Sequence, residues 1–488
     1  MSQATLSAAA TERSNWSEDW LAVVIGLGVF ALALLSTVGV DALGWVATTS
    51  VWTDPTAALA PVSKAYAFLG GGASLVLTWL ALMVVLAAGA AALGEDMRRF
   101  AVAFTLVFVL AYAGWFLGGW ARLAAVTPSD QAKFGLAWSL KLTNEGGFIV
   151  ALIAGLVIAN VFPGFAERLK SAIRPELYIK IAIVILGAFI AVTAAGKLSL
   201  ASSLLLRGVA AIVEAYLIYW PVVYLIARKG FGFSREWSAP LASGISICGV
   251  AAAIATGGAI RARPQVPVLV SSLVVIFAVV EVLILPWIAE TFLAHEPLVA
   301  AAWMGLAVKT DGAAVAAGGI TQSLIQAQAA AQGIAYQPGW MLSVTATVKV
   351  FIDVFIGVWA FILAWIWTNH VNPGADTAQA IEIWRRFPKF ILGFVATFAI
   401  ALVLALATPA GTSGKLAAAI GEANVLRVIF FTLTFFSIGV MSDFRKLWAD
   451  GFGRLAAVYV VSLIGFVIWV GFVISWLFFA GVKPPLAS

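Results

Sequence analysis

The 488-residue sequence is poor in charged residues, histidine and cysteine. Asp, Glu, Lys and Arg make up 11% of it, whereas soluble domains carry about a quarter. The single cysteine, Cys248, excludes an intramolecular disulfide and any zinc site built from several cysteines. The two histidines, His295 and His370, both fall in predicted loops. A histidine-rich metal centre is therefore not expected.

Common catalytic patterns are absent as well. The sequence contains no phosphate-binding GxxxxGK[ST] and no HExxH, and two loop histidines cannot serve a Ser/His/Asp set. We expect a protein that is not an enzyme and that has no cofactor beyond a coupled sodium ion or proton.

Long apolar runs dominate what is present. Hydrophobic residues reach 62% of the sequence, and the mean hydropathy is +1.02. Apolar runs of about 20 residues indicate membrane-spanning helices, and they lack the alternation of a membrane β-barrel. We predict an all-α polytopic membrane protein with about 13 transmembrane helices. The runs lie near 20–38, 67–93, 100–119, 147–162, 178–195, 204–227, 240–260, 266–288, 298–319, 341–368, 390–408, 423–442 and 455–480.

The net charge of +6 comes mostly from short basic clusters between these runs. The clusters are Arg98 and Arg99; Arg168, Lys170 and Arg174; Arg228, Lys229 and Arg235; Arg385, Arg386 and Lys389; Arg445, Lys446 and Arg454. With alternating spans all of them lie on the side of the N-terminus, which the positive-inside rule makes the cytoplasm. We expect the cytoplasmic membrane of a prokaryote, an uncleaved first span, the N-terminus inside, the C-terminus outside and no nucleic-acid partner. Arg261 and Arg263 are exceptions, because this count places them outside.

The predicted spans suggest an internal duplication. We expect a polar tail at 1–19 and a three-helix extension at 20–146. Two inverted repeats of five helices follow, at 147–288 and 296–480, a plan typical of secondary transporters. The polar stretch Gln322–Pro338 is either a small external helix or a mobile flap.

We predict a broken helix at the fourth position of each repeat, 241–260 and 427–444, because glycines and hydroxyls gather there. Two crossed broken helices would direct the backbone N–H groups of half-helices into one cavity and favour an anion. The alternative is that the small residues only mediate close helix packing. The predicted substrate-binding residues are Ser246, Cys248, Gly249, Thr434, Ser437 and Gly439.

Ionisable residues inside spans also require a reason, because charge in the membrane is costly. Lys349 and Asp353 lie one turn apart on one face and can neutralise each other. They serve either coupling or a structural ion pair. Lys309, Thr310 and Asp311 interrupt another run before a glycine, so the backbone is expected to unwind there. These five residues are the candidates for ion coupling or charge compensation. Glu214 is either a buried proton-coupling carboxylate or a helix-packing residue, with packing preferred, and Glu281 is expected to reach toward the interface.

Several segments are similar to the YeiH-type sulfate exporter family, over roughly residues 147–480. They include ISICGVAAAIATGGAIRA (245–262), MGLAVKTDGAAVAAGG (304–319), TATVKVFID (345–353) and FFTLTFFSIGVMSDFRKL (430–447). The resemblance implies the fold of bile acid symporters and sodium/proton antiporters, with elevator-type movement. One position departs from the family pattern: where Lys followed three residues later by Arg is expected, Lys349 is followed by Ile352 and Asp353.

Three functional hypotheses follow. The first is a proton- or sodium-coupled secondary transporter that exports a small inorganic or organic anion, most readily sulfate, sulfite or a sulfonate. The second is a cation/proton antiporter on the same scaffold, with Asp311 and Asp353 carrying the ion. The third is a sensor or structural membrane protein, against which the costly intramembrane charges argue. The expected partners are the lipid bilayer and a second copy of the chain in a homodimer.

Overall fold

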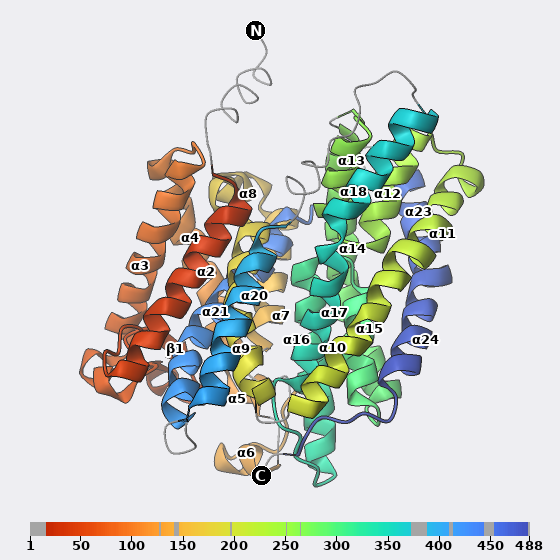
Figure 1. Ribbon diagram of the computed structural model, residues 1–488. Coiled ribbons are helices and arrows are strands. Elements are labelled where there is room, and N and C mark those ends of the chain that lie inside the picture. Colours follow the sequence, from red (N-terminus) through yellow and green to blue (C-terminus); the bar gives the residue numbers. More distant parts are fainter. Residues whose placement is uncertain are drawn as a thin grey trace. The chain divides into compact units, whose positions relative to one another are not determined.

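The computed structural model describes residues 16–125, 128–140, 146–195, 198–249, 251–263, 265–371, 388–408, 413–443 and 453–486. Most of this part is helical (Figure 1). The strands in it, β1 (Ala47–Thr49) and β2 (Leu59–Pro61), form one antiparallel pair. The prediction of an all-α polytopic membrane protein is confirmed.

Within the described residues, 10 helices are long and apolar enough to cross a membrane. The number rises to 11 if Gly147–Val161 and Pro163–Ala172, bent by 119°, form one span. The predicted count of 13 is therefore not confirmed. The two remaining predicted spans, 240–260 and 298–319, are each interrupted in the middle.

The chain forms two compact units. Unit 1 comprises residues 1–197 and 389–441, and unit 2 comprises residues 198–388 and 442–488. Each unit thus takes segments from both predicted repeats, and the repeat boundaries themselves stay a prediction.

Unit 1 is a helix bundle with a small strand pair. Its helices are α2 (Glu18–Leu35), α3 (Gly70–Ala92), α4 (Met97–Gly118), α5 (Ala121–Ala124), α6 (Pro128–Lys133), α7 (Gly146–Val161), α8 (Pro163–Leu169), α9 (Pro175–Ala195), α20 (Phe390–Ala407) and α21 (Ser413–Met441). Helix α9 packs against α2, α20 and α21, and α7 packs against α4 and α21. Phe30, Ala188 and Ala401 are part of the apolar core between these helices.

The predicted break in 427–444 is wrong, because α21 is continuous to Met441. Two of its hydroxyls bond within the helix: Thr432 donates to the carbonyl of Val428 (2.9 Å) and Thr434 donates to that of Phe430 (2.8 Å). Gly439 serves a close approach to α7, since an added Cβ would lie 2.9 Å from Cα of Gly155. The small residues here mediate packing and not a break.

Unit 2 combines long helices with two interrupted segments. Its elements are α10 (Leu198–Val213), the π-helix η5 (Glu214–Tyr219), α11 (Trp220–Leu225), the π-helix η6 (Ile226–Gly230), α12 (Arg235–Ser246), α13 (Ala251–Ala259), α14 (Gln265–Leu293), α15 (Pro297–Ala307), α16 (Asp311–Ala331), α17 (Trp340–Val354), α18 (Ile356–Ile366), the π-helix η7 (Trp367–Val371), α23 (Gly453–Ser462), the π-helix η8 (Leu463–Val467) and α24 (Ile468–Phe479). The polar stretch after 322 is no separate external helix, because α16 runs on to Ala331. Gln322 in it accepts hydrogen bonds from the backbone N–H groups of Gly339 and Leu342, at the start of α17.

The first interrupted segment folds back on itself. Thr256 of α13 donates to the hydroxyl of Ser243 of α12 (2.7 Å), and Arg263 donates through its backbone and Nε to Glu236 (2.8 and 3.0 Å). A helix that continued across the membrane would separate residues 236 and 263 by about 40 Å at 1.5 Å per residue. The segment α12–α13 is therefore a re-entrant hairpin, here named hairpin A, with its tip at 247–249.

The second interrupted segment also starts and ends on one side. Glu296, before α15, accepts from the backbone N–H of Gly481 (2.8 Å), and Gln337, after α16, donates to the carbonyl of Pro485 (2.7 Å). Residues 481 and 485 are at most about 15 Å apart along the chain, so both ends of α15–α16 lie at the same end of unit 2. This segment is hairpin B, with its tip at 308–310.

The two hairpins replace the predicted pair of crossed broken helices. They also account for the exceptions to the charge rule. If hairpin A returns to the side on which it began, Arg261 and Arg263 fall on the same side as the other basic clusters when spans are counted along the chain. The predicted orientation itself stays a prediction.

Candidate functional site

The tips of hairpins A and B touch through their backbones. Helix α12 ends at Ser246, and Ile247 leaves the helical conformation (φ −109°, ψ −83°). In hairpin B, Val308 and Thr310 are extended. The N–H of Gly249 donates to the carbonyl of Lys309 (2.6 Å). A Cβ at Gly249 would lie 3.1 Å from Cγ2 of Thr310, so glycine permits this approach.

Positive and negative side chains compensate the unpaired backbone groups at the ends of the half-helices. Lys349 of α17 donates to the carbonyl of Ile247 at the C-terminal end of α12 (2.7 Å), and Lys309 donates to the carbonyl of Leu306 at the end of α15. Thr310 caps α16 by accepting from the N–H of Ala313 (3.2 Å), and Asp311 occupies its first turn. Cations at helix C-termini and carboxylates at N-termini are the stabilising arrangement. The start of α16 is thus already matched by a negative side chain.

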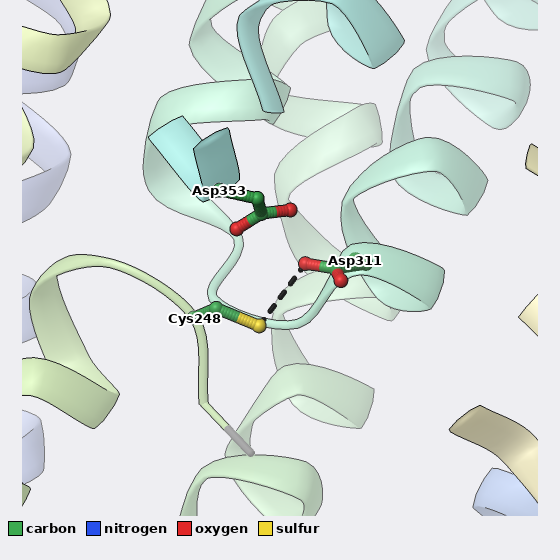
Figure 2. A group of neighbouring side chains, drawn as sticks. All are labelled: Cys248, Asp311 and Asp353. Atoms are coloured by element: carbon green, nitrogen blue, oxygen red, sulfur yellow. Dashed lines mark hydrogen bonds between the residues drawn. The ribbon is translucent and has the colours of Figure 1, made fainter. Parts of the chain in front are cut away.

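A thiol and two carboxylates converge next to these tips (Figure 2). Cys248 donates to Oδ1 of Asp311 across 3.1 Å, and a ligand atom each of Cys248, Asp311 and Asp353 lie within 4.8 Å of one another. All three residues are at most 2% exposed. Nζ of Lys349 is 3.8 Å from Oδ1 of Asp311, and Asp353 adds a negative charge near the same ammonium group. The arrangement supplies oxygen and sulfur atoms suited to a small cation or a proton, with a lysine as counter-charge.

A second buried group surrounds Lys309. Glu281 of α14 accepts from the hydroxyl of Tyr459 (2.6 Å) and from the backbone N–H of Lys309 (3.3 Å). The ammonium group of Lys309 lies 4.5 Å from the ring centre of Tyr219. Glu214 is also beside Tyr219 and near Lys309.

The sequence misplaced Glu281 and left the role of Glu214 open. Glu281 is 3% exposed and in contact with hairpin B, so the prediction that it reaches the interface is wrong. Glu214 is fully buried at the start of a π-helix, within the same polar group. The signal in the sequence was a carboxylate within an apolar run, which is costly unless it has a partner or a function.

The base of hairpin A carries an ion pair at the end of unit 2. Glu236 is held by the side chain and the backbone of Arg263, and these hydrogen bonds keep the pKa of its carboxyl below the usual range. The pair joins the first turn of α12 to the chain after α13, and so fixes the two legs of the hairpin at their base.

The chain is similar to several known proteins. The family profile described as "Conserved hypothetical protein 698" matches residues 134–458. A UPF0324 membrane protein of Nitrosomonas europaea is 39% identical over 477 residues, which are 96% of this chain and 97% of that protein. This chain belongs to the UPF0324 membrane protein family. The resemblance to the YeiH-type family is thereby confirmed.

Two further similarities were found for this UPF0324 protein. An uncharacterized protein of Archaeoglobus fulgidus is 48% identical over 170 residues, 30% of this chain and 90% of that one. A sodium proton antiporter from Methanocaldococcus jannaschii, solved at pH 8, aligns with 75% of this chain and 99% of its own at 12% identity, with a TM-score of 0.17. The matched region of the family profile begins after the first three helices, whereas the Nitrosomonas protein aligns with nearly the whole chain.

Most of the predicted site residues of this UPF0324 protein lie together in unit 2, and the others belong to unit 1. Those at or beside the hairpin tips are Ser246, Cys248, Gly249, Lys309, Thr310, Asp311, Lys349 and Asp353, all in unit 2. Thr434, Ser437 and Gly439 belong to α21 of unit 1, where Thr434 and Gly439 have the packing contacts given above. We call Cys248, Gly249, Thr310, Asp311, Lys349 and Asp353 the tip site.

Proposed function

We propose that this UPF0324 protein is a secondary transporter whose tip site binds a cation. This cation either drives the transport of another solute or is itself transported. The observation that carries the proposal is the convergence of Cys248, Asp311 and Asp353 at the meeting point of two re-entrant hairpins. Irregular backbone at membrane depth occurs where it is enclosed by protein or lines a pathway. Transporters commonly bind their substrates and ions at such discontinuities.

Cation/proton antiport is the function that the geometry supports best. The carboxylates of Asp311 and Asp353 share one ammonium group, that of Lys349, so an ionised pair of carboxylates leaves one negative charge in the site. An uncompensated buried charge costs several kcal/mol. A sodium ion or a proton removes this cost, and a second cation can take its place when the first leaves.

Export of a small anion is the second candidate. It is favoured by the buried ammonium groups of Lys309 and Lys349, which donate to backbone carbonyls. If the tips separate, these ammonium groups can bind sulfate, sulfite or a sulfonate instead. In this version the carboxylates bind the driving cation. Cys248 and Gly249 would then contact the anion, as predicted from the sequence.

We further propose an elevator-type movement, a location in the inner membrane and assembly as a homodimer without enzymatic activity. Support for the movement is that the tip site belongs entirely to one compact unit, as a carrier domain requires. The first three helices lie in the other unit and outside the matched family profile. They are the segment that we assign to the dimer contact.

The test is flux in proteoliposomes that contain the full chain. A pH-sensitive dye inside the vesicles reports cation/proton exchange with sodium, lithium or potassium, and labelled sulfate and sulfite report anion export. We expect D311N and D353N each to abolish exchange, while the matched exposed substitution D54N leaves it unchanged. Exchange that persists in the D311N/D353N double variant would show that the tip site does not bind the cation. Anion flux without cation exchange would favour the second candidate.

A further inference from the structure

Among the described residues, the buried interior of unit 2 contains more carboxylates than ammonium groups. The carboxylates are Glu214, Glu281, Asp311 and Asp353, and the ammonium groups are Lys309 and Lys349. Each of these residues is at most 3% exposed. Fully ionised, the group carries two excess negative charges. Buried charges without partners are neutralised by protonation or by bound cations. One excess charge is at the tip site, and the other lies around Lys309.

We propose that Glu214 and Glu281, with Lys309 between them, form a second cation position that takes a proton, separate from the cation at Cys248, Asp311 and Asp353. This inference rests on the proposed function and adds to it a coupling ratio of two positive charges per loaded unit. The ligand is a monovalent cation. The space between two glutamates and an ammonium group that is already present suits a proton better than a metal ion.

Glu214 is the residue that points to a bound cation. It is fully buried, and neither of its carboxylate oxygens accepts a hydrogen bond of ordinary geometry from the described residues. The nearby hydroxyl of Tyr219 donates to the carbonyl of Val467 instead (2.7 Å). Gly471 lies against both groups, since an added Cβ there would meet the hydroxyl of Tyr219 at 2.7 Å and Oε1 of Glu214 at 3.5 Å. A proton on this carboxyl removes the cost of an ionised group that has no hydrogen-bond donor.

The π-helix that begins at Glu214 supports a functional role. Such insertions are uncommon within helices and occur frequently at functional sites. Here the inserted turn, Glu214–Tyr219, contains both the carboxylate and the ring over which the ammonium group of Lys309 lies.

Glu281 connects this position to the tip site through one residue. Its Oε2 accepts from the backbone N–H of Lys309, while the carbonyl of Lys309 accepts from Gly249 of hairpin A. A change of charge on Glu281 therefore acts on the same residue that holds the two tips together. The second position can thus sense whether the hairpins are in contact.

Several elements around Lys309 contribute titratable or charged groups that could share the proton. These groups are Glu214 and Tyr219 of η5, Tyr216 of η5, Glu281 of α14, Cys248 of hairpin A, Asp311 of α16, Lys349 and Asp353 of α17, and Tyr459 of α23. The tyrosines remain neutral in this scheme and donate hydrogen bonds. Two negative charges are shared by the four carboxylates, and two of those carboxylates lie at the tip site.

The experiment measures the charge moved per cycle. Reversal potentials of the cation flux in proteoliposomes, at a fixed sodium gradient and a varied pH gradient, give the coupling ratio. We expect the number of protons per cycle to fall by one in E281Q and in E214Q, with exchange retained. E281D keeps the carboxylate and should restore the native ratio. E296Q at the exposed base of hairpin B is the matched control and should keep the native ratio. An unchanged ratio in both E214Q and E281Q would overturn the inference.

Absence of any flux would contradict the proposed function alone. A second measurement then still tests the proton position. The midpoint of thermal unfolding of the detergent-solubilised full chain is followed from mildly acidic to alkaline pH. Ionisation of the excess carboxylates destabilises the native chain, so its midpoint should fall as pH rises. The E214Q/E281Q variant should lose about half of this fall, because two of four carboxylates are gone. A variant with the native pH dependence would exclude protonation at this position.

Discussion

Lys349 offers the sharpest test of how the hairpin tips are held. Its ammonium group is 2% exposed, donates to the carbonyl of Ile247 across 2.7 Å and lies 3.8 Å from Oδ1 of Asp311. The substitution K349M keeps most of the side-chain volume but leaves the carboxylate and the end of α12 without a counter-charge. Removal of one partner of a buried ion pair costs about 3–5 kcal/mol. For a compact unit of the size of unit 2, roughly 240 residues, this cost corresponds to a loss of roughly 10 °C in the unfolding midpoint.

A double-mutant cycle separates the ion pair from general damage to packing. Thermal unfolding is measured for K349M, D311N and the double variant, with K415M on the exposed face of α21 as a control expected to change stability by less than about 0.5 kcal/mol. Because D311N removes the charge that K349M leaves unpaired, the double variant should be more stable than the sum of the single losses predicts, by at least about 1 kcal/mol. Losses that simply add, or a loss below about 1 kcal/mol in K349M, would refute the arrangement described here.

Three further predictions concern other parts of the chain. Gly439→Ala should destabilise the protein by about 1–3 kcal/mol through overpacking of α21 against α7, whereas Gly465→Ala, where an added Cβ meets nothing within 4 Å, should not; thermal unfolding compares the two. Alkylation of Cys248, the single cysteine, should slow several-fold when a bound cation occupies its ligand group, as followed by mass spectrometry; a rate independent of every cation tested would contradict a shared site. Glu236→Gln should cost under about 1 kcal/mol, because the pair with Arg263 is partly exposed, but should speed hydrogen exchange at the base of hairpin A. Since the pKa of Glu236 is lowered, acid should have the same effect on the native chain as pH falls through that pKa.

Much of the fold could be predicted from composition and local pattern. Apolar runs without charge identify membrane helices because the bilayer demands internally bonded backbone, whatever the neighbours are. The unwinding at Lys309, Thr310 and Asp311 was also predictable, since three polar residues before a glycine interrupt an apolar run. The glycines and hydroxyls of 241–260 likewise predicted a break, which the structure places after Ser246.

The prediction from local pattern failed where one residue pattern is compatible with two local structures, a broken helix and a close helix contact. Hydroxyls and glycines near 437 resemble those near 246, yet α21 is continuous because Gly439 meets Gly155 across a helix interface. Small residues suit close packing and broken helices equally, so only the neighbouring helix decides between them.

The sequence by itself determined that this chain lies in a membrane, that it is helical and where charge interrupts its apolar runs, because these properties depend on a few consecutive residues and on the solvent. Only the tertiary structure decided that the interrupted segments turn back as hairpins and which charges face one another. Lys349 and the carbonyl of Ile247 are 102 residues apart in the chain, as Glu281 and Tyr459 are 178 apart. Such pairs form because several helices pack around one buried polar group, and no local property of either residue encodes the partner.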